Sequence, residues 1–454
     1  MAVSVGGLSG ALKGEVVERG DARYDEARAL YNAMVDKRPA AVAYCVDTAD
    51  VAEAVRFARK EGLPVAVRCG GHSGGGFGSV DDGLVIDLSE LHDVTVEPEA
   101  AVAHVGGGAK LRELIDATHE HGLTVPVGII GTTGVGGLTL GGGLGHLTRG
   151  YGLTIDNLLA ATVVLADGTV TQCDAETEPD LFWAIRGGGG NFGVVTKFTF
   201  RCHPVTMVLA GPVMYDIEQT PEVIRWYDGF LASAPESLSG FVSIMSVPPA
   251  PPFPEELHLR KVCALVWTQV GDEEGEALRE ARAYGEPLVD GLAPMPLPVW
   301  NTAFDGMFPP GEQWAWHGDF VKEVPDEALE QHLEWGRKLP TWKSLMHLYA
   351  IDGAAARVGP DETAWGYRDA RWAQVIAGVD PEPANAQAIR EWSRGYTDAV
   401  RPYAMAGGYL NFQMDEPDRV RGMYGANYDR LARIKAHYDP ENVFRVNQNI
   451  KPAS

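Results

Sequence analysis

The sequence predicts two domains of mixed helix and strand, on three observations. A chain of 454 residues is long enough to bury more than one large core. Its first part alternates strand-like and helix-like segments, which is typical of α/β structure. Near Thr206 the composition changes, and from there to about Ala404 amphipathic helices alternate with strand-like runs. Helices over an antiparallel sheet would explain this second part, as a domain able to cap the first.

Between Ala22 and Leu88 the pattern alternates helix and strand. The helix expected over Thr48–Glu61 has an aspartate near its start and Gly62 directly after its end, which are capping signals. The other expected elements are a helix over Ala22–Val35 and strands over Ala41–Cys45, Pro64–Arg68 and Leu84–Leu88.

A glycine-dense loop with a single histidine, His72, separates the last two of these strands. Glycine permits positive φ and a close approach to a ligand, and the clustered N–H groups of such a loop can bind a pyrophosphate. The loop is also compatible with a plain tight turn. Gly71–Gly75 matches the G-x-S-x-G pattern of hydrolases with Ser73 as nucleophile, but that pattern needs a following helix, and here a strand follows.

A second glycine-rich stretch, Gly128–Gly152, follows a predicted strand pair and helix. Val, Leu and Ile are interleaved with its glycines, which favours the lining of a bound cofactor over a linker. The preceding elements are strands over Val94–Val96 and Ala101–Val105 and a helix over Lys110–His121.

The next elements are a buried strand over Leu158–Leu165, a turn into a strand over Val170–Cys173, and a helix over Asp180–Ala184. Gly188, Gly190 and Gly193 then have the spacing of a dinucleotide fingerprint. That fingerprint must open a helix, and the segment after Gly193 is strand-like, so a Rossmann interpretation is rejected.

The expected second domain holds helices and strands in alternation. They are helices over Glu273–Gly285 and Asp326–Lys338 and strands over Val262–Val270, Trp314–Val321 and Leu345–Ile351. After it, Gly407–Met414 is strand-like and Asp418–His437 is helical.

Composition limits the partners. The net charge of −24 argues against a nucleic-acid partner. The five cysteines have no metal-site spacing and suggest reduced thiols and no metal: Cys45, Cys69, Cys173, Cys202 and Cys263. Neither a signal peptide nor a membrane span is apparent, so a cytoplasmic protein is expected.

Five segments carry a family resemblance: RCGGHS (68–73), GVGGLTLGGGLG (134–145), YGLTIDN (151–157), DLFWAIRGGGGNFGVV (180–195) and YDPENVFRVNQNIKP (438–452). Together they resemble the FAD-linked oxidases of the vanillyl-alcohol-oxidase type, most closely the berberine-bridge-enzyme-like branch. The resemblance implies an α+β fold in which residues 1–205 form an FAD-binding domain of two α+β subdomains, divided near 90. Residues 206–404 would form a substrate domain with an antiparallel sheet covered by helices, and residues 405–454 would return to the FAD domain.

The resemblance also implies covalent FAD. His72 occupies the position that bonds to the flavin 8α carbon, and Gly70, Gly71, Ser73 and Gly74 would meet the pyrophosphate. Where many relatives have a second, cysteinyl link, this chain has Ile130, so a single link is expected. The remaining residues expected to line the cofactor are Arg68, Cys69, Thr133, Gly134, Gly136, Gly137, Gly141, Gly145, Gly193, Val195, Asn447 and Asn449.

The catalytic base is less defined. Strand alternation would place Tyr409 and Asn411 on one face, and relatives often have a substrate-facing tyrosine at the former position. Arg357 stands where the plant branch has a catalytic glutamate, and its charge could lower the pKa of Tyr409. Asp319, His317 and His347 are alternative bases on predicted strands, although each is also compatible with an ordinary polar role. Thr133 would lie beside the reactive edge of the flavin and could affect its reactivity with oxygen.

The sequence thus predicts a flavin-dependent oxidoreductase. It would transfer a hydride from a C–H beside an alcohol or amine of a small molecule (a sugar, alkaloid or polyketide-like compound) to FAD, with molecular oxygen as acceptor. A dehydrogenase with another acceptor is the close alternative. A Ser73 hydrolase and a non-catalytic flavin-binding protein are alternatives from other classes, and the oligomeric state is left open.

Overall fold

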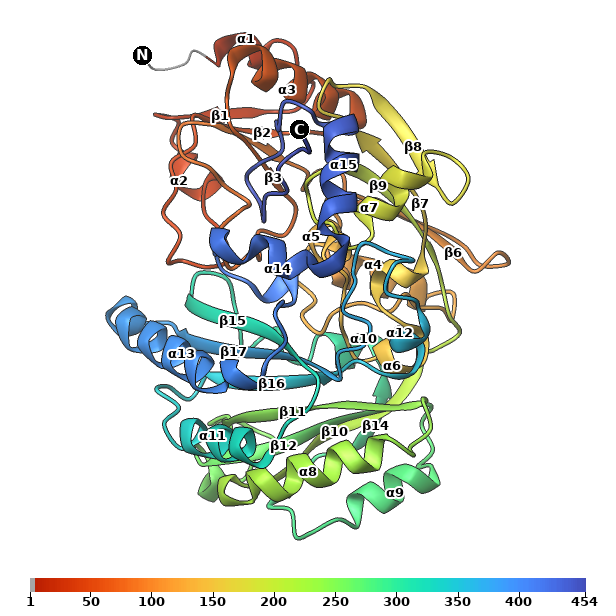
Figure 1. The fold of residues 1–454 in the computed structure, drawn as a ribbon, viewed down its shortest axis with the longest axis vertical. Helices are drawn as coiled ribbons and strands as arrows, with labels where there is room; N and C mark the ends of the chain where they lie inside the picture. The colour runs from red at the N-terminus through yellow and green to blue at the C-terminus, as the bar shows by residue number, and fades with distance from the viewer. Residues whose placement is uncertain (1–4) are drawn as a thin grey trace.

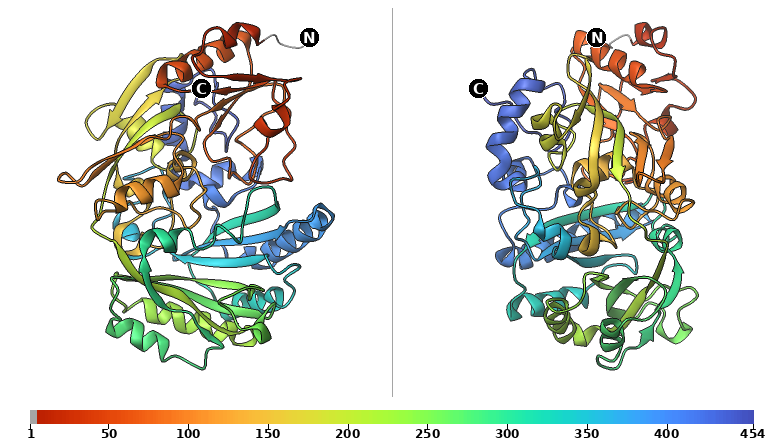
Figure 2. Two further views of the ribbon diagram at one scale, coloured as in Figure 1. Left: turned by 180° about the vertical axis from the view of Figure 1, so that it is seen from behind. Right: turned by 90° about the vertical axis from the view of Figure 1, so that its right-hand side faces the viewer.

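The structure is a computed structural model, and it describes residues 5–454. In this part of the chain three β-sheets form the framework of an α+β fold (Figure 1). The first two sheets lie at one end of the molecule and the third at the other, and the C-terminal helices return beside the first two. Figure 2 shows the same arrangement from behind and from the side.

The first sheet has the order β1-β2-β4-β3, with β2, β4 and β3 parallel and β1 antiparallel. Its strands are β1 (Val16–Glu18), β2 (Ala41–Tyr44), β3 (Val65–Arg68) and β4 (Leu84–Asp87). Its helices are α1 (Gly6–Ser9), α2 (Tyr24–Ala27) and α3 (Thr48–Glu61). Helix α3 confirms the capping signals, because the Asp47 side chain accepts a hydrogen bond from Asp50 N and Gly62 ends the helix at φ +66°.

The helix predicted over Ala22–Val35 is wrong, because only α2 forms there. Beyond it the chain is extended toward the third sheet. The buried Asn32 side chain donates to Trp314 O at 3.0 Å and accepts from Trp314 N at 3.1 Å, and Tyr31 N donates to Gly71 O at 3.3 Å. These long-range bonds outweigh the helical spacing of the apolar residues.

The second sheet is antiparallel, in the order β5-β6-β9-β7-β8. Its strands are β5 (Val94–Glu97), β6 (Val102–Gly106), β7 (Leu158–Val164), β8 (Val170–Asp174) and β9 (Val194–Arg201). The helices beside it are α4 (Leu111–His119), α5 (Val135–Leu140), α6 (Thr148–Tyr151) and α7 (Pro179–Ile185). A strand, β9, follows Gly193, which confirms the rejection of the Rossmann interpretation.

The third sheet is antiparallel, in the order β13-β10-β12-β11-β16-β17-β15, with β14 beside β10. Its strands are β10 (Met207–Asp216), β11 (Leu238–Ser246), β12 (Lys261–Val270), β13 (Val289–Asp290), β14 (Ala293–Pro296), β15 (Gln313–Val321), β16 (Leu345–Ala350) and β17 (Trp372–Asp380). Its helices are α8 (Thr220–Leu231), α9 (Glu276–Arg282), α10 (Leu297–Asn301), α11 (Asp326–Gly336), α12 (Gly353–Arg357) and α13 (Ala386–Val400).

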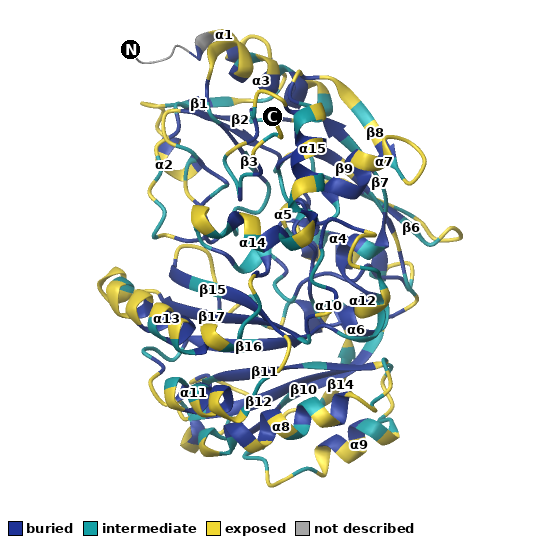
Figure 3. Cartoon of the chain, viewed as in Figure 1, coloured by how far each residue is buried: buried dark blue, intermediate teal, exposed yellow. Residues whose placement is uncertain are grey.

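Two cores lie on the two faces of this third sheet. One face packs against the outer helices, through residues such as Met346, Leu348 and Tyr396. The opposite face packs toward the first two sheets, through residues such as Phe241 and Val375. In Figure 3 the central strands are buried on both faces, while α8, α9, α11 and α13 expose their outer sides. The sheet therefore has an inward face that can form the roof of a site.

The C-terminal segment corrects two expectations. Gly407–Met414 is not a strand but contains the short 3-10 turn η6 (Leu410–Phe412), and the predicted helix over Asp418–His437 is divided at Gly425, which has φ +53°. The helices are α14 (Val420–Tyr424) and α15 (Tyr428–Tyr438). Lys435 of α15 is fully buried, and its ammonium group donates to Asn191 O at 2.6 Å and Phe444 O at 2.8 Å, which fastens this segment beside the second sheet.

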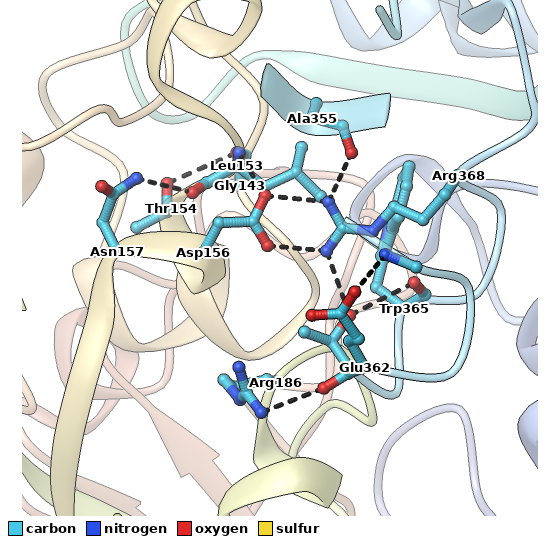
Figure 4. Close-up of polar contacts among 12 residues, drawn as sticks. Gly143, Leu153, Thr154, Asp156, Asn157, Arg186, Ala355, Glu362, Trp365 and Arg368 are labelled. Carbon is cyan, nitrogen blue, oxygen red and sulfur yellow. Dashed lines mark hydrogen bonds and ion pairs between the residues drawn. The ribbon is translucent and has the colours of Figure 1, made fainter. Parts of the chain in front are cut away.

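A buried ion pair joins the turn that follows the second glycine-rich stretch to the segment that follows α12 (Figure 4). Arg368 forms two hydrogen bonds with the carboxylate of Asp156, at 2.8 and 2.6 Å, and also donates to Ala355 O and Thr363 Oγ1. The two charged side chains are only 2% and 8% exposed. The pair therefore holds the turn η1 (Thr154–Asn157) against the segment that contains Thr363 and Arg368.

No helix in the described part of the chain is both long enough and apolar enough to cross a membrane. All five cysteines are free thiols.

We predict that Arg368→Ala lowers the free energy of unfolding by about 3–5 kcal/mol, because it leaves the Asp156 carboxylate buried without its partner. The midpoint of urea denaturation would measure the loss. The matched control is Arg357→Ala, which removes an exposed ion pair with Glu236 and should cost no more than about 1 kcal/mol. Equal shifts for the two variants would contradict the prediction.

Candidate active site

A cavity of about 410 Å³ lies where the three sheets and the C-terminal segment meet. Its floor consists of the loop after β3, the glycine-rich stretch around α5, and the start of β9. Its roof is the inward face of the third sheet, and η6 and Val446–Gln448 close one side. All three sheets and the C-terminal segment therefore contribute residues to its wall.

Two glycine loops form the floor by direct backbone contact. A Cβ atom at Gly70 would lie 2.4 Å from Gly134 N, and one at Gly134 would lie 2.3 Å from Cys69 Sγ, so neither position tolerates a side chain. At Gly137 and Gly190 a Cβ would meet nothing within 4 Å, because both positions face the open cavity. A floor of this kind presents bare backbone to a ligand, which fits a cofactor with a pyrophosphate.

His72 lies on this floor between Tyr31 and two threonines. Its ring stacks on Tyr31 with a centroid distance of 3.8 Å and an interplanar angle of 18°. Its Nε2 lies 3.1 Å from Thr132 Oγ1 and its Nδ1 3.4 Å from Thr133 Oγ1. Burial, with a smaller effect from Lys110, lowers the pKa of His72 to about 3, so the imidazole is neutral and its unprotonated ring nitrogen can act as a nucleophile.

Most residues expected to line the cofactor do line the cavity. They are Arg68, Cys69, Gly70, Gly71, His72, Ser73, Ile130, Thr133, Gly134, Gly136, Gly137, Gly141, Gly193, Val195 and Asn447. Arg68 is not a free cation there, because it forms a buried ion pair with Asp87, its partner across β3 and β4. Its charge therefore stabilises the sheet.

Three expected cofactor residues lie outside the cavity wall. Gly74 packs under the roof, where a Cβ would lie 2.0 Å from Trp316 Nε1. Gly145 packs against Val127, whose carbonyl oxygen would be 1.7 Å from a Cβ. Asn449 is not on the wall, and its buried Oδ1 has no partner among the described residues. At Gly74 and Gly145 the lack of a side chain allows neighbouring segments to pack closely.

The alternation of the roof strands separates the candidate bases. On β15, Trp314 and Trp316 line the cavity, so His317 and Asp319 face the other way, toward α13. On β16, Leu345, His347 and Tyr349 all line the cavity. Of the three candidates on roof strands, the structure places only His347 at the site.

His317 and Asp319 belong instead to a polar cluster on the outer face. His317 Nδ1 lies 3.0 Å from Glu416 Oε1, and Arg419 bonds to both Glu416 and Asp319. The hydrogen bond with His317 and the contacts with Arg419 lower the pKa of Glu416 to about 2. These charges pair with one another and hold the segment after η6 to β15.

The hypothesis that Tyr409 faces a substrate is wrong in this structure. Tyr409 is 1% exposed and lies behind the floor, where its hydroxyl accepts hydrogen bonds from Gly143 N at 2.8 Å and Asn411 Nδ2 at 3.0 Å. Burial raises the pKa of Tyr409 to about 12. Asn411 lines the cavity and also donates to Leu138 O at 3.0 Å, so the two residues support the second glycine loop.

Arg357 is also remote from the site. It is exposed at the end of α12 and forms an ion pair with Glu236. It therefore cannot lower the pKa of Tyr409, and the expected convergence of the two side chains does not occur.

Sequence reasoning missed Tyr349 and Ser243, which complete a polar group in the roof. Tyr349 OH lies 2.8 Å from His347 Nδ1, and Ser243 is the cross-strand partner of His347. Burial lowers the pKa of His347 to about 3 and raises the pKa of Tyr349, so both side chains are neutral. The alternation in LMHLYA, with a histidine and a tyrosine two residues apart, was the available signal.

Ser73 does not occupy a nucleophile elbow. It lies in the irregular loop between β3 and β4, where its Oγ accepts a weak hydrogen bond from Phe77 N at 3.4 Å. The helix that a hydrolase of this type requires is missing from this described loop.

Comparisons with known proteins agree with this geometry. A family model described as "FAD binding domain" matches residues 39–174, and one described as "Berberine and berberine like" matches residues 408–451. The chain is 32% identical to the uncharacterised FAD-linked oxidoreductase YgaK of Bacillus subtilis over 97% of each chain. It is 30% identical to (R)-6-hydroxynicotine oxidase of Paenarthrobacter nicotinovorans, again over 97% of each. A crystal structure of 6-hydroxy-D-nicotine oxidase from Arthrobacter nicotinovorans superposes with a TM-score of 0.85 at 26% identity, covering 97% of this chain and 98% of the other.

A second histidine, His146, lies directly behind the cavity wall. Its ring is 4.8 Å from that of Trp300 and 6.2 Å from that of Phe241, and its Nδ1 lies 3.4 Å from Thr268 Oγ1. His146 is 3% exposed, and burial lowers its pKa to about 3. The neutral ring therefore acts as part of the packing behind the aromatic wall.

We predict that His146 makes stability sensitive to acid. Its pKa is about 3 in the folded chain and about 6.5 when unfolded, so its contribution is complete above pH 6.5 and is lost as pH falls toward 3. At pH 5 the loss is about 2 kcal/mol. Urea midpoints at pH 7, 6 and 5 should therefore fall less steeply in His146→Leu than in the wild type. The exposed His437→Gln should keep the wild-type slope, and an unchanged slope in His146→Leu would refute the prediction.

Proposed function

The chain belongs to the berberine-like family of FAD-dependent oxidoreductases, and on this premise we propose that it oxidises a small molecule at a carbon bearing a hydroxyl or amino group, with molecular oxygen as acceptor. One observation carries the proposal. The His347–Tyr349 pair in the roof faces a floor of bare glycine backbone across a single cavity. Bound FAD supplies the hydride acceptor and the site of reoxidation.

We assign FAD binding to residues 1–205 together with the returning segment 405–454, and the roof over the substrate to residues 206–404. The cavity wall supports this division, because its glycines come from the first range and its aromatic roof from the second. Val446–Gln448 add a third stretch beside the floor.

We propose that FAD is covalently attached through His72 alone. The neutral ring lines the cavity and is fixed by the Tyr31 stack and by the contacts of its two nitrogens with Thr132 and Thr133. Ile130 offers no thiol for a second link. Cys69 also lines the cavity, but it packs against Gly134, and burial raises its pKa to about 12, which suppresses the thiolate.

We propose that Tyr349 and His347 together accept the substrate proton. The phenol can donate its proton to His347 Nδ1 while its oxygen receives the proton of a substrate hydroxyl or amine. Their distance of 2.8 Å allows that transfer within an existing hydrogen bond. Both groups are neutral before the reaction, so the buried site holds no uncompensated charge in the resting state.

The acceptor distinguishes an oxidase from a dehydrogenase. We propose oxygen, and we place Thr133 beside the reactive edge of the flavin because it lines the cavity within 3.4 Å of His72 Nδ1. Hydrogen peroxide release in stoichiometric amounts with product would support an oxidase, and reoxidation only by added dyes would support a dehydrogenase.

The flavin link is tested by denaturation in acid. Wild-type protein should be yellow and keep its flavin in the precipitate, and peptide mass mapping should find flavin on a single peptide that contains His72. His72→Ala should release any flavin that it binds, whereas Cys69→Ala should retain the covalent flavin. A colourless wild type, or flavin on Cys69, would contradict the assignment.

The base is tested by flavin reduction under anaerobic conditions, with any alcohol or amine that reduces the wild-type flavin. Tyr349→Phe and His347→Gln should each lower the rate by about 10²–10⁴, the usual worth of a positioned acid–base group. Tyr409→Phe keeps the ring and removes only a hydroxyl behind the floor, so its rate should fall far less. If Tyr409→Phe shows the large loss and Tyr349→Phe does not, the assignment of the base is wrong.

A further inference from the structure

We propose that the substrate is an uncharged aromatic alcohol, bound between the apolar walls with its hydroxyl group on Ser243 and the His347–Tyr349 pair. This inference rests on the function proposed above and narrows its substrate to one chemical class. Three features of the roof end of the cavity carry it: the missing counter-charges, the aromatic walls, and a single polar group.

Charged side chains are nearly absent from the cavity wall. Among the described residues that line it, Arg68 alone is a Lys, Arg, Asp or Glu, and its charge is taken up by Asp87 in the floor. Glu312 and Lys343 lie behind the wall and form a buried ion pair, with Lys343 also donating to Met307 O at 2.8 Å. An ammonium or carboxylate group at the roof would have no partner, and burying a lone charge costs several kcal/mol.

Aromatic side chains dominate the substrate end. Its aromatic residues are Phe241, Phe304, Phe308, Trp314, Trp316 and Phe412. Trp314 and Trp316 meet at 5.2 Å and 68°, which gives this end a flat face and an edge for a planar ligand. A sugar carries hydroxyl groups around its whole ring, and these walls offer them only the indole N–H groups of Trp314 and Trp316, which would leave most of the hydroxyl groups without hydrogen bonds.

Apart from the indole N–H groups of Trp314 and Trp316, the polar side chains of the roof strands form one contiguous group. Ser243 on β11 and His347 on β16 are cross-strand partners, and Tyr349 follows on the same face of β16. On the other side of His347 its partner is Val375, and Phe241 lies 4.8 Å from the rings of both His347 and Tyr349. The hydroxyl and imidazole groups of the roof are therefore confined to one spot, which suits a ligand with one hydroxyl.

Ser243 has an unmet hydrogen bond at this spot. It is 1% exposed, and its Oγ has no partner in the part of the chain that the structure describes. A buried hydroxyl without a partner is costly, and the cost is removed when a ligand supplies the partner. Ser243 can donate to a substrate oxygen while Tyr349 accepts from the same hydroxyl. We therefore assign Ser243 as a substrate-binding residue.

The test is titration calorimetry of the purified protein with a matched series at pH 7, under anaerobic conditions so that oxygen cannot support turnover of the alcohol. 2-Naphthalenemethanol, 2-naphthylmethylamine and 2-naphthoate share one ring system and are neutral, cationic and anionic, and cellobiose represents a sugar. The alcohol should bind at least about tenfold more tightly than either charged analogue, since each would bury a lone charge. Cellobiose should bind more weakly than the alcohol. A charged analogue or cellobiose that binds as tightly as the alcohol would overturn the inference.

Ser243→Ala should weaken the binding of the alcohol by about 3–10-fold, which is the value of one hydrogen bond. The matched control is Ser246→Ala on the same strand, which lies on the opposite face and should bind the alcohol like the wild type. An unchanged affinity in Ser243→Ala would remove Ser243 from the site. The analogue series on the wild type does not depend on the folding of any variant.

The flavin spectrum and peroxide release of the same samples report separately on the proposed function. A colourless protein that still prefers the neutral alcohol would overturn that function and support the cavity chemistry. A yellow, peroxide-forming enzyme that prefers cellobiose would support the proposed function and overturn the inference of an aromatic alcohol.

Discussion

The close approach of two glycine loops is the constraint on which the site depends. Gly70 and Gly134 touch backbone to backbone, and a Cβ atom on either would overlap the other loop. This contact joins the first sheet to the second, forms part of the floor and packs Cys69 against Gly134. It also fixes His72, two residues after Gly70, within reach of Thr132 and Thr133 on the opposite loop. The position of His72 thus follows from residues that have no side chains.

The alternation of side chains along β-strands determines which residues of the roof face the cavity. Successive side chains of a strand lie on opposite faces of the sheet, one facing the outer helices and the next facing the cavity. Residues adjacent in sequence therefore have different surroundings. Trp316 lies over the floor while His317, the next residue, pairs with Glu416 on the outer face. On β16 the same rule places Met346 and Leu348 in the helical core and His347 and Tyr349 in the site. The order of strands then brings Ser243 beside His347.

Local signals in the sequence were sufficient where an element is stabilised by its own residues. Helix Thr48–Glu61 carries its caps at Asp47 and Gly62. Local signals failed where distant contacts decide the structure. Asn32 extends the chain because it bonds to Trp314, and Tyr409 turns behind the floor because Gly143 N donates to its hydroxyl. Sequence alone could not show that Arg357 lies outside the site and Tyr349 inside it, because this depends on which loops and strands meet.

The same long-range contacts connect the floor to the roof through one short segment. Tyr31 stacks on His72 and donates to Phe308 O at 2.7 Å, and the next residue, Asn32, pairs with the backbone of Trp314. Phe308 and Trp314 both line the substrate end. A shift of β15 would therefore move Tyr31, which supports His72. Tyr31 and Asn32 thus hold the floor and the roof of the cavity together. Because the walls are held in this way, the fit of a ligand depends on which side chains the strands present.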